Sequence, residues 1–328
     1  MEQDIQENRL QELDAELLPI LLLDMTTQRN IIWGTDGYSS RGDGYGEHDE
    51  IRPEAITGEN GHVIVPRMNK QKAEQEARSR DKGEVFTPAW VVNEQNNLVD
   101  AAWFGHKVVF NYERVKKWKA TYKKIPFPKA LHKTWQDYVT ANRLEVSCGE
   151  APYLVSRYDV VAGCEIPVKK RIGILDRKLR IVTENTTSSE EWLMWAEKAL
   201  QSTYGFDWQG DNVLLARENV LCSVAETYKE RFGDEMPSDY WIRFAHIVVW
   251  NIWQMDGLKY VIPDSCHDIE DRSKYSFVDE LERKPVPMVQ CPGCKEKNNK
   301  KHNGIYCQIM DWQENKPVRF IDTIGGGV

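Results

Sequence analysis

Residues 143–154, with the sequence RLEVSCGEAPYL, hold the feature on which the interpretation of this chain depends. Leu144 and Val146 are typical of the start of a buried strand. The strand then breaks at a Cys-Gly-Glu turn, where glycine lets the backbone turn sharply and approach a ligand closely. One such turn fits an ordinary corner as well as the floor of a nucleotide-cofactor pocket, so the surrounding sequence has to distinguish the two.

The bulk composition predicts a soluble, cytoplasmic protein. Of the 328 residues, 41% are hydrophobic and 29% are charged, and no signal-peptide pattern or membrane-length apolar run is present. The seven cysteines are an odd number, which favours reduced thiols or a metal site over a disulfide framework. The net charge of -8 argues against nucleic-acid binding over the whole surface but is compatible with a local basic groove.

Predicted helices and short strands are interspersed along the chain, as in α/β proteins. Helices are predicted at 4–25 (strained or ended near Pro19), 68–83, 188–203 and 211–232, and directly after Thr87-Pro88. Strands are predicted at the start of 143–154, at 204–207 and at 244–253, and a long Gly-, Asp- and Ser-rich loop at 33–51. We therefore expect an N-terminal helical and loop region (1–80), an α/β region (81–262) and a cysteine-rich C-terminal extension (263–328).

Two aromatic features have two explanations each. Residues 113–124, ERVKKWKATYKK, interleave basic and aromatic side chains, which is expected of an exposed helix face or of a nucleic-acid contact. The chain also contains 12 Trp, which fit core packing or base stacking.

Two carboxylates follow predicted strands in the same way as the glycine turn. Asp207 ends the strand at Tyr204-Gly205-Phe206, and Asp256 comes just after the apolar run that ends in NIWQ. In open α/β sheets, ligands bind outside the carboxyl ends of the strands. One carboxylate can accept the ribose hydroxyls of a nucleotide and the other an exocyclic amine. Taken in order, these stretches predict a nucleotide-cofactor site.

The motif series resembles the gamma-class adenine-amino DNA methyltransferases of restriction–modification systems, including proteins described as restriction endonuclease subunit M. GEVFTPAWVV (83–92) looks like the opening motif of the family, and LEVSCGEAPYL (144–154) like its S-adenosylmethionine motif. YGFDWQGDNVLLARENVL (204–221) is similar to the acidic motif, and NIWQMDGL (251–258) to the third-strand motif. The resemblance covers roughly residues 83 to 260.

The resemblance implies a Rossmann-like, S-adenosylmethionine-dependent methyltransferase core with DNA as substrate and a role in phage defence. Thr87 and Pro88 would line the methionine end of the cofactor, Asp207 would hold the ribose and Asp256 the adenine amine. Cys148 would be a packing residue beside the turn, because no histidine follows at a spacing suited to a nucleophile. The full set of implied cofactor-binding residues is Phe86, Thr87, Pro88, Cys148, Gly149, Glu150, Asp207 and Asp256.

Two departures from the family pattern affect these expectations. Ala151-Pro152 stands where the cofactor turn has its second glycine, and no Asn-Pro-Pro-Tyr tetrad, the loop that grips the flipped adenine, occurs in the 328 residues. We therefore expect an incomplete core, no catalytic residue in this chain, and a complementary methyltransferase chain or segment covering an otherwise open sheet edge, unless the domain is rearranged and self-capped. The alternative is a non-catalytic methyltransferase-like protein that binds DNA or the cofactor.

A cysteine cluster lies near the end of the sequence. CPGCKEKNNKKHNGIYC (291–307) contains Cys291, Cys294, His302 and Cys307, a set able to hold zinc tetrahedrally. The other interpretation is a metal-free turn with free thiols. If zinc is bound, we expect a structural ion, because no carboxylate of an open catalytic site is evident.

Overall fold

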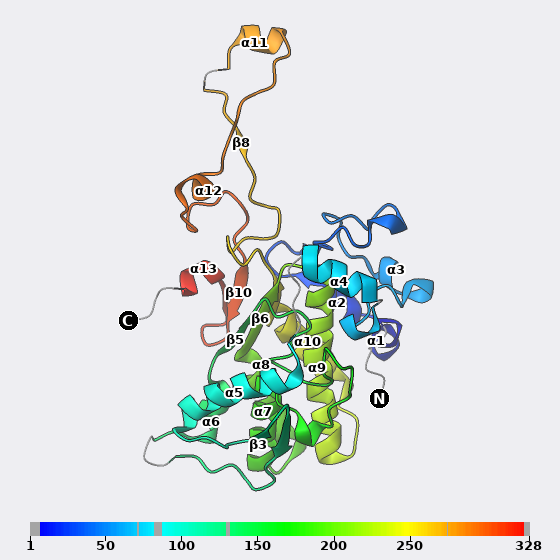
Figure 1. Ribbon diagram of the computed structural model, residues 1–328, viewed down its shortest axis with the longest axis vertical. Helices are drawn as coiled ribbons and strands as arrows, with labels where there is room; N and C mark the ends of the chain where they lie inside the picture. The colour runs from blue at the N-terminus through cyan, green and yellow to red at the C-terminus, as the bar shows by residue number, and fades with distance from the viewer. Residues whose placement is uncertain (1–6, 71, 82–86, 129–131, 274, 325–328) are drawn as a thin grey trace.

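A parallel sheet of three strands lies at the centre of the computed structural model, which describes residues 7–70, 72–81, 87–128, 132–273 and 275–324 (Figure 1). The strands are β5 (Arg143–Val146), β6 (Thr203–Asp207) and β7 (Ile252–Gln254), and they lie side by side in chain order, β5-β6-β7. Helices connect each strand to the next, as parallel pairing requires. The protein is therefore a mixed helix–strand protein with a parallel sheet, in agreement with the expected α/β class.

The remaining elements surround this sheet. The longer helices are α4 (Lys72–Asp81), α5 (Ala89–Phe104), α7 (Ile174–Asn185), α8 (Ser189–Gln201), α9 (Gly210–Phe232) and α10 (Ser238–Asn251). The shorter helices are α1 (Glu7–Leu13), α2 (Leu17–Leu22), α3 (Pro53–Ile56), α6 (Trp135–Thr140), α11 (Phe277–Leu281), α12 (Pro292–Glu296) and α13 (Phe320–Thr323), with 3-10 turns η1 (Ser39–Arg41), η2 (Gly58–Asn60), η3 (Arg67–Asn69) and η5 (Val168–Lys170). Antiparallel pairs join β1 (Leu23–Asp24) to β2 (Arg29–Asn30), β3 (Asn111–Arg114) to β4 (Lys117–Ala120), β8 (Ile269–Glu270) to β9 (Met288–Val289) and β10 (Gln308–Asp311) to β11 (Lys316–Arg319).

Local capping signals predicted several helices correctly. Helix α5 follows Thr87-Pro88, and α8 and α9 match the predictions at 188–203 and 211–232. The Ser188 side chain caps α8 by accepting the Glu191 N–H at 3.2 Å. Helix α9 ends at Gly233, whose φ of 83° is the left-handed conformation that glycine adopts without strain.

Three predictions of secondary structure are wrong. Residues 244–251 are the end of helix α10 and not a strand, because this segment packs against α2, α8 and α9 and so is apolar on several sides. Residues 111–120 form the β3–β4 hairpin in place of a helix. The helix predicted at 4–25 divides into α1 and α2, and Pro19 lies in the first turn of α2, where a missing N–H leaves no intrahelical bond unmade.

The register of the sheet places an apolar row on one of its faces. Leu144 pairs with Tyr204, and Val146, Phe206 and Trp253 form the next row across the three strands. The opposite face is covered by helices, and Ile252 belongs to the main hydrophobic core. The two faces are thus packed against different parts of the chain.

The apolar row is covered unevenly. Phe206 and Trp253 pack against Phe320 of α13, with ring centroids 5.9 and 5.0 Å away. Leu144 and Val146, in contrast, are 44% and 64% exposed. The expectation that these two residues are buried is therefore wrong, because the cover that buries Phe206 and Trp253 does not extend over β5, the edge strand of the described sheet.

The N-terminal region shares the core of the α/β region. Leu17, Leu18, Leu21 and Leu22 of α2 are fully buried in the main hydrophobic cluster, where α2 packs against α10 and α9. Hydrophobic packing is therefore continuous across the expected boundary near residue 80.

A buried ion cluster also joins the N-terminal region to helix α9. Asp211 accepts hydrogen bonds from Lys70 Nζ at 3.0 Å, Arg78 Nη1 at 2.7 Å and the Tyr38 hydroxyl at 2.7 Å. Burial opposes ionisation of Asp211, but Arg78 and Lys70 outweigh it and hold the pKa of the carboxyl well below its usual range. The cluster therefore contains an ionised carboxylate in a site closed to water.

We predict that Asp211→Asn destabilises the protein strongly, because it removes the charge that compensates buried Lys70 and Arg78. Breaking a buried ion pair on one side costs about 3–5 kcal/mol. The free energy of unfolding, measured in urea, should fall by that amount, whereas Asp234→Asn at an exposed loop position should leave it within about 0.5 kcal/mol of wild type. A loss for Asp211→Asn no larger than for Asp234→Asn would contradict this assignment.

Candidate functional site

The carboxyl ends of the three strands meet at one edge of the sheet. The backbone pairing extends past the strands, from Cys148 N–H to Phe206 C=O at 2.8 Å and from Met255 N–H to Asp207 C=O at 2.9 Å. The Cys-Gly-Glu turn, Asp207 and the residue before Asp256 are consequently neighbours, as the sequence predicted from their positions after the strands.

A hydrogen bond connects the glycine turn to the acidic residue of the next strand. Gly149 N–H donates to Asp207 Oδ2 at 2.9 Å, and Gln209 N–H donates to Asp207 Oδ1 at 3.0 Å. The carboxylate is 9% exposed and is oriented by both amides. Both oxygens of the carboxylate therefore accept backbone amides at the strand end.

The turn itself has an unusual backbone. Gly149 has a φ of 54°, and Ala151, where the sequence comparison led us to expect a second glycine, has a φ of 63°. A non-glycine residue in the left-handed region costs roughly 1–2 kcal/mol. The alanine thus adopts a glycine-like conformation at an energetic cost.

Glu150 is committed to contacts within the protein. Its carboxylate accepts the Arg67 N–H at 2.6 Å and the Tyr158 hydroxyl at 2.8 Å, and it is 1% exposed. Burial and the neighbouring Glu150 raise the pKa of Tyr158, so the phenol remains a hydrogen-bond donor. Glu150 therefore ties the turn to the N-terminal region.

Cys148 lies in the core beneath the turn. It is 2% exposed, and burial, with the nearby Asp207 and Glu145, raises the pKa of its thiol well above the usual value. A neutral, enclosed thiol is a poor nucleophile. The geometry thus agrees with the packing role expected of this cysteine.

Asp256 lies directly after β7 and shapes a turn. Its Oδ1 accepts the N–H groups of Leu258 at 2.9 Å and Lys259 at 3.1 Å, and Lys259 Nζ lies 3.5 Å from Oδ2. The carboxylate is thus near the sheet edge, held mainly by local backbone amides.

The opening motif lies at the start of α5. Pro88 is the N-cap residue, and Ala89 N–H donates to Asp159 at 3.1 Å. Asn96 of the same helix donates to Tyr153 C=O at 3.0 Å, which joins α5 to the segment after the glycine turn. Thr87 and Pro88 are half-buried at this position, and Phe86 lies outside the described residues.

The loop after β2 also reaches the strand ends, which the sequence did not reveal. The Gln254 side chain makes two hydrogen bonds with the backbone of Ile32, at 2.9 and 2.8 Å, and Gly210 N–H donates to Trp33 C=O at 3.0 Å. A Cβ on Gly34 would come within 2.7 Å of the Trp208 carbonyl oxygen. This close fit explains why a glycine lies at position 34. The only sign of the contact in the sequence was the Gly-, Asp- and Ser-rich composition of the loop.

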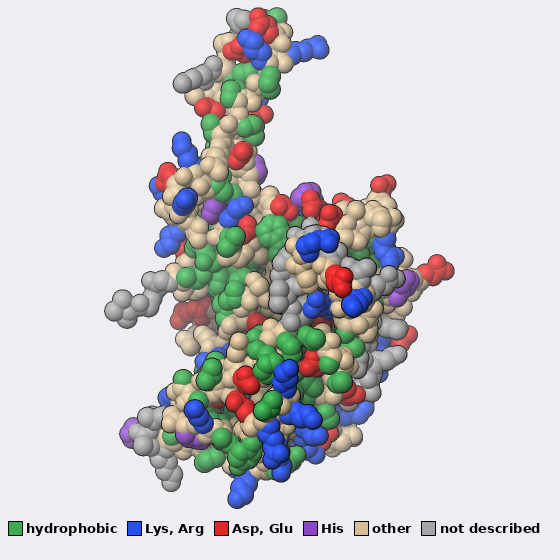
Figure 2. All heavy atoms as spheres, viewed as in Figure 1, with side chains coloured by type: hydrophobic (Ala, Val, Ile, Leu, Met, Phe, Trp, Pro, Cys, Tyr) green, Lys and Arg blue, Asp and Glu red, His purple; other side chains and the backbone are tan. Residues whose placement is uncertain are grey.

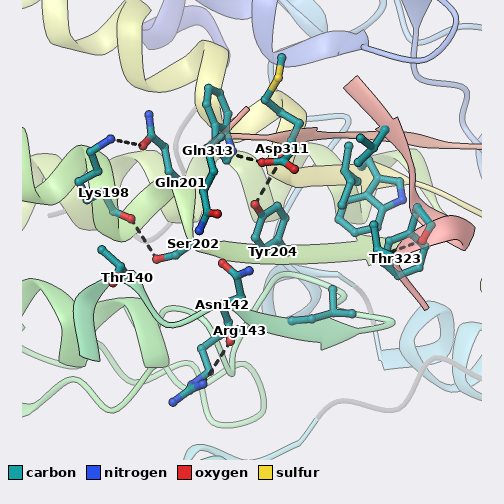
Figure 3. Close-up of a pocket in the computed structure, with 17 residues that line it drawn as sticks. Thr140, Asn142, Arg143, Lys198, Gln201, Ser202, Tyr204, Asp311, Gln313 and Thr323 are labelled. Atoms are coloured by element: carbon teal, nitrogen blue, oxygen red, sulfur yellow. Dashed lines mark hydrogen bonds between the residues drawn. The ribbon is translucent and has the colours of Figure 1, made fainter. Parts of the chain in front are cut away.

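A cavity of about 830 Å³ lies away from these residues (Figure 3). It is bounded by the start of β5, the end of α8 and the β10–β11 hairpin, and Arg143, Lys198, Tyr204 and Asp311 are among its lining residues. None of the described residues predicted to bind the cofactor lines this cavity.

Four metal-ligating side chains converge in the C-terminal extension. The ligand atoms of Cys266, Cys291, Cys294 and His302 all lie within 4.8 Å of one another. His302 Nδ1 is 3.4, 3.7 and 3.6 Å from the sulfurs of Cys266, Cys291 and Cys294. A tetrahedral zinc site with Zn–S of about 2.3 Å and Zn–N of about 2.0 Å has ligand–ligand edges of roughly 3.5–3.8 Å. The cluster can therefore hold a metal ion.

The structure replaces one of the four predicted ligands. Cys291, Cys294 and His302 belong to the cluster, but Cys307 is fully buried in a separate hydrophobic cluster, where its thiol donates to Gln254 C=O at 3.5 Å. Cys266 takes its place. It is 25 residues before Cys291 in sequence, and the intervening chain forms an arm that returns to the same point.

The electrostatics of the cluster suit a cation. Burial opposes ionisation of Cys291, but the backbone amides of Cys294 and Asn303 outweigh it and lower the pKa of the thiol to about 6. Burial and the thiols of Cys291 and Cys294 raise the pKa of Cys266 to about 12. A bound cation would remove the repulsion between neighbouring thiolates.

The cluster lies at the base of an arm that projects from the body, with α11 at its far end (Figure 1). Cys266 precedes β8, and Cys291 follows β9, so a metal ion would join the two chains of the arm where they leave the body. Such a position is typical of a structural ion.

Comparison with protein-family models, curated protein sequences and solved structures gives no match. Among the described residues, no helix has both the length and the apolar character needed to cross a membrane.

We predict that Cys266→Ser weakens metal binding at least tenfold, whereas Cys307→Ala leaves it unchanged. The reason is that Cys266 is one of the four converging ligands and Cys307 is not. Zinc content and the absorption of the Co²⁺-substituted protein in the thiolate charge-transfer region would measure the difference. Loss of metal in Cys307→Ala with retention in Cys266→Ser would restore the ligand set expected from sequence.

Gly293→Ala should also weaken metal binding. A Cβ on Gly293 would lie 2.5 Å from the His302 backbone nitrogen and 2.6 Å from its Nδ1, so the histidine would be displaced from the cluster. Competition with a chromogenic chelator should show at least a tenfold loss of affinity. Gly233→Ala, at a position with no atom within 4 Å of the added Cβ, is the matched control for metal affinity.

Proposed function

We propose that this chain is the S-adenosylmethionine-binding part of a DNA adenine methyltransferase of a restriction–modification system. One observation carries the proposal: the Gly149 turn and Asp207 are hydrogen bonded at the carboxyl edge of a parallel sheet whose strands follow in chain order. A Rossmann-like core places its ligand at this edge. The motif order in the sequence supports the same assignment.

Each residue of the motif series would have a defined task. Thr87 and Pro88 would line the methionine end, and the Gly149 turn would lie under the methionine and ribose. Asp207 would accept hydrogen bonds from the ribose hydroxyls, and Asp256 from the adenine amine. The cofactor would supply the methyl group, and the described residues would bind and orient it.

The residues present suit a nucleoside ligand at this edge. Asp207 is a carboxylate fixed in orientation by two backbone amides, as a hydroxyl-binding group should be. Gly149 and Ala151 both have positive φ, so the backbone of the turn follows the path that two glycines would give it.

A complementary methyltransferase chain or segment would complete the enzyme by pairing with β5. Among the described residues, β5 pairs only with β6, and its Leu144 and Val146 side chains are 44% and 64% exposed. An edge strand with apolar side chains is a ready site for another strand. Such a chain would also bring the loop that holds the target adenine.

The Cys266–Cys291–Cys294–His302 cluster is proposed to bind zinc as a structural ion. Its four ligands converge within 4.8 Å of one another, and four protein ligands around a tetrahedral ion leave no open position for a substrate. Zinc at this point would fix the direction of the arm without taking part in methyl transfer.

Calorimetry with S-adenosylmethionine tests the central assignment. The wild-type chain should bind, and Asp207→Asn should weaken binding about ten- to a hundredfold, because hydrogen bonds to a charged group contribute about 1.5–3 kcal/mol. Asn keeps one of the two acceptors that serve the Gly149 and Gln209 amides, so circular dichroism and urea unfolding are measured alongside to show that the variant is folded. Asp234→Asn, which makes the same chemical change at an exposed loop, is the control. Absent binding by the wild type, or equal binding by both variants, would refute the assignment.

A further inference from the structure

The β3–β4 hairpin concentrates positive charge in a protein of net charge -8. Six cations lie within residues 114–124, all exposed: Arg114, Lys116, Lys117, Lys119, Lys123 and Lys124. Figure 2 shows Lys and Arg side chains gathered at the lower end of the molecule, over the position of β3 in Figure 1. The sequence alone fitted two explanations of this segment, an exposed solvated face and a nucleic-acid contact.

The register divides the hairpin into two different faces. Tyr112 lies opposite Lys119, and Arg114 lies opposite Lys117, so these four side chains share one face. Tyr112 is 54% exposed on that face. The outer face of the hairpin is therefore entirely basic and aromatic.

The inner face fixes the hairpin to the body. Trp118 Nε1 donates to Lys170 C=O at 2.8 Å, and its ring packs against the buried cluster that includes Ala89 and Val92 of α5. Glu113 accepts a hydrogen bond from Asn97 at 2.6 Å. The hairpin is thus held by its inner side chains against the helix that begins at the opening motif, and its outer face contributes nothing to this packing.

The outer face has an electrostatic cost that the fold does not offset. Like charges directly opposite each other, as in Arg114 and Lys117, destabilise an antiparallel pair. Over the residues that the structure describes, none of the six cations forms an ion pair with a carboxylate. Within the described chain these charges therefore have no carboxylate partner, and exposed Tyr112 and Tyr122 add flat rings beside the cations.

We propose that the outer face of the β3–β4 hairpin binds duplex DNA through its phosphate backbone. A two-stranded β-ribbon is one of the two elements that fit the major groove. Lysine and arginine contacts to phosphates supply most non-specific affinity and need no neutralising carboxylates on the protein. The inference rests on the proposed function only in choosing DNA as the polyanion.

Fluorescence anisotropy with a 30-base-pair duplex, without S-adenosylmethionine, tests this surface. The wild type should bind at 50 mM salt and lose affinity about a hundredfold by 200 mM, as expected for roughly four phosphate contacts. Replacing Arg114, Lys117 and Lys119 together by Gln should weaken binding at least tenfold. The control replaces Lys295, Lys297 and Lys300, exposed near the metal cluster, by Gln and should change affinity less than twofold.

Four results would overturn the proposal. They are no binding by the wild type, equal losses in the two triple variants, tighter binding to the single strand than to the duplex, and preference for phosphatidylserine vesicles over DNA. Because the assay contains no cofactor and the variants lie outside the strand-end residues, failure here leaves the cofactor assignment intact. Failure of cofactor binding would likewise leave this result standing.

Discussion

The hydrogen bond from Gly149 to Asp207 is the constraint around which the α/β region is arranged. It joins the end of β5 to the end of β6, and it forms where the two strands are parallel, adjacent and in register. The same carboxylate accepts the Gln209 amide at the entrance to α9, so one side chain sets the turn, the strand end and the start of the longest helix in the described chain.

Two further buried carboxylates connect this edge to the N-terminal region. Glu150 holds the backbone of Arg67, and Asp211 holds the side chains of Lys70 and Arg78. Since these anions come from the turn and from the first turn of α9, the N-terminal region is shaped around the strand ends. Its packing therefore serves stability and also defines the surroundings of the proposed cofactor site.

Local signals made part of this architecture predictable from sequence. Ser188 and Gly233 mark helix ends through their own backbone preferences, and Asp207 could be placed because it ends a short strand. Non-local features could not be predicted in the same way. The cysteine at 266 becomes a ligand only because an arm of 24 intervening residues returns to it, and no spacing rule relates it to Cys291.

The errors in helix and strand assignment have related causes. The apolar run before β7 was predicted as a strand because neighbouring helices cover it on several sides. A helix that is apolar on several sides lacks the periodicity of an amphipathic helix. In the β3–β4 hairpin, Lys117 and Lys119 alternate with Trp118, a period of two that dense positive charge concealed. Exposure of Leu144 and Val146 depends on what covers the sheet, which the residues of β5 do not encode.

Amide hydrogen exchange with and without S-adenosylmethionine is the sharpest test of whether the cofactor binds at the strand ends beside Gly149 and Asp207, because it locates the ligand as well as detecting it. We expect slower exchange with cofactor in peptides that cover residues 147–152 and 207–210, and unchanged exchange in the β3–β4 hairpin. Protection confined to peptides that line the cavity near Arg143 and Lys198, or no protection anywhere, would contradict it.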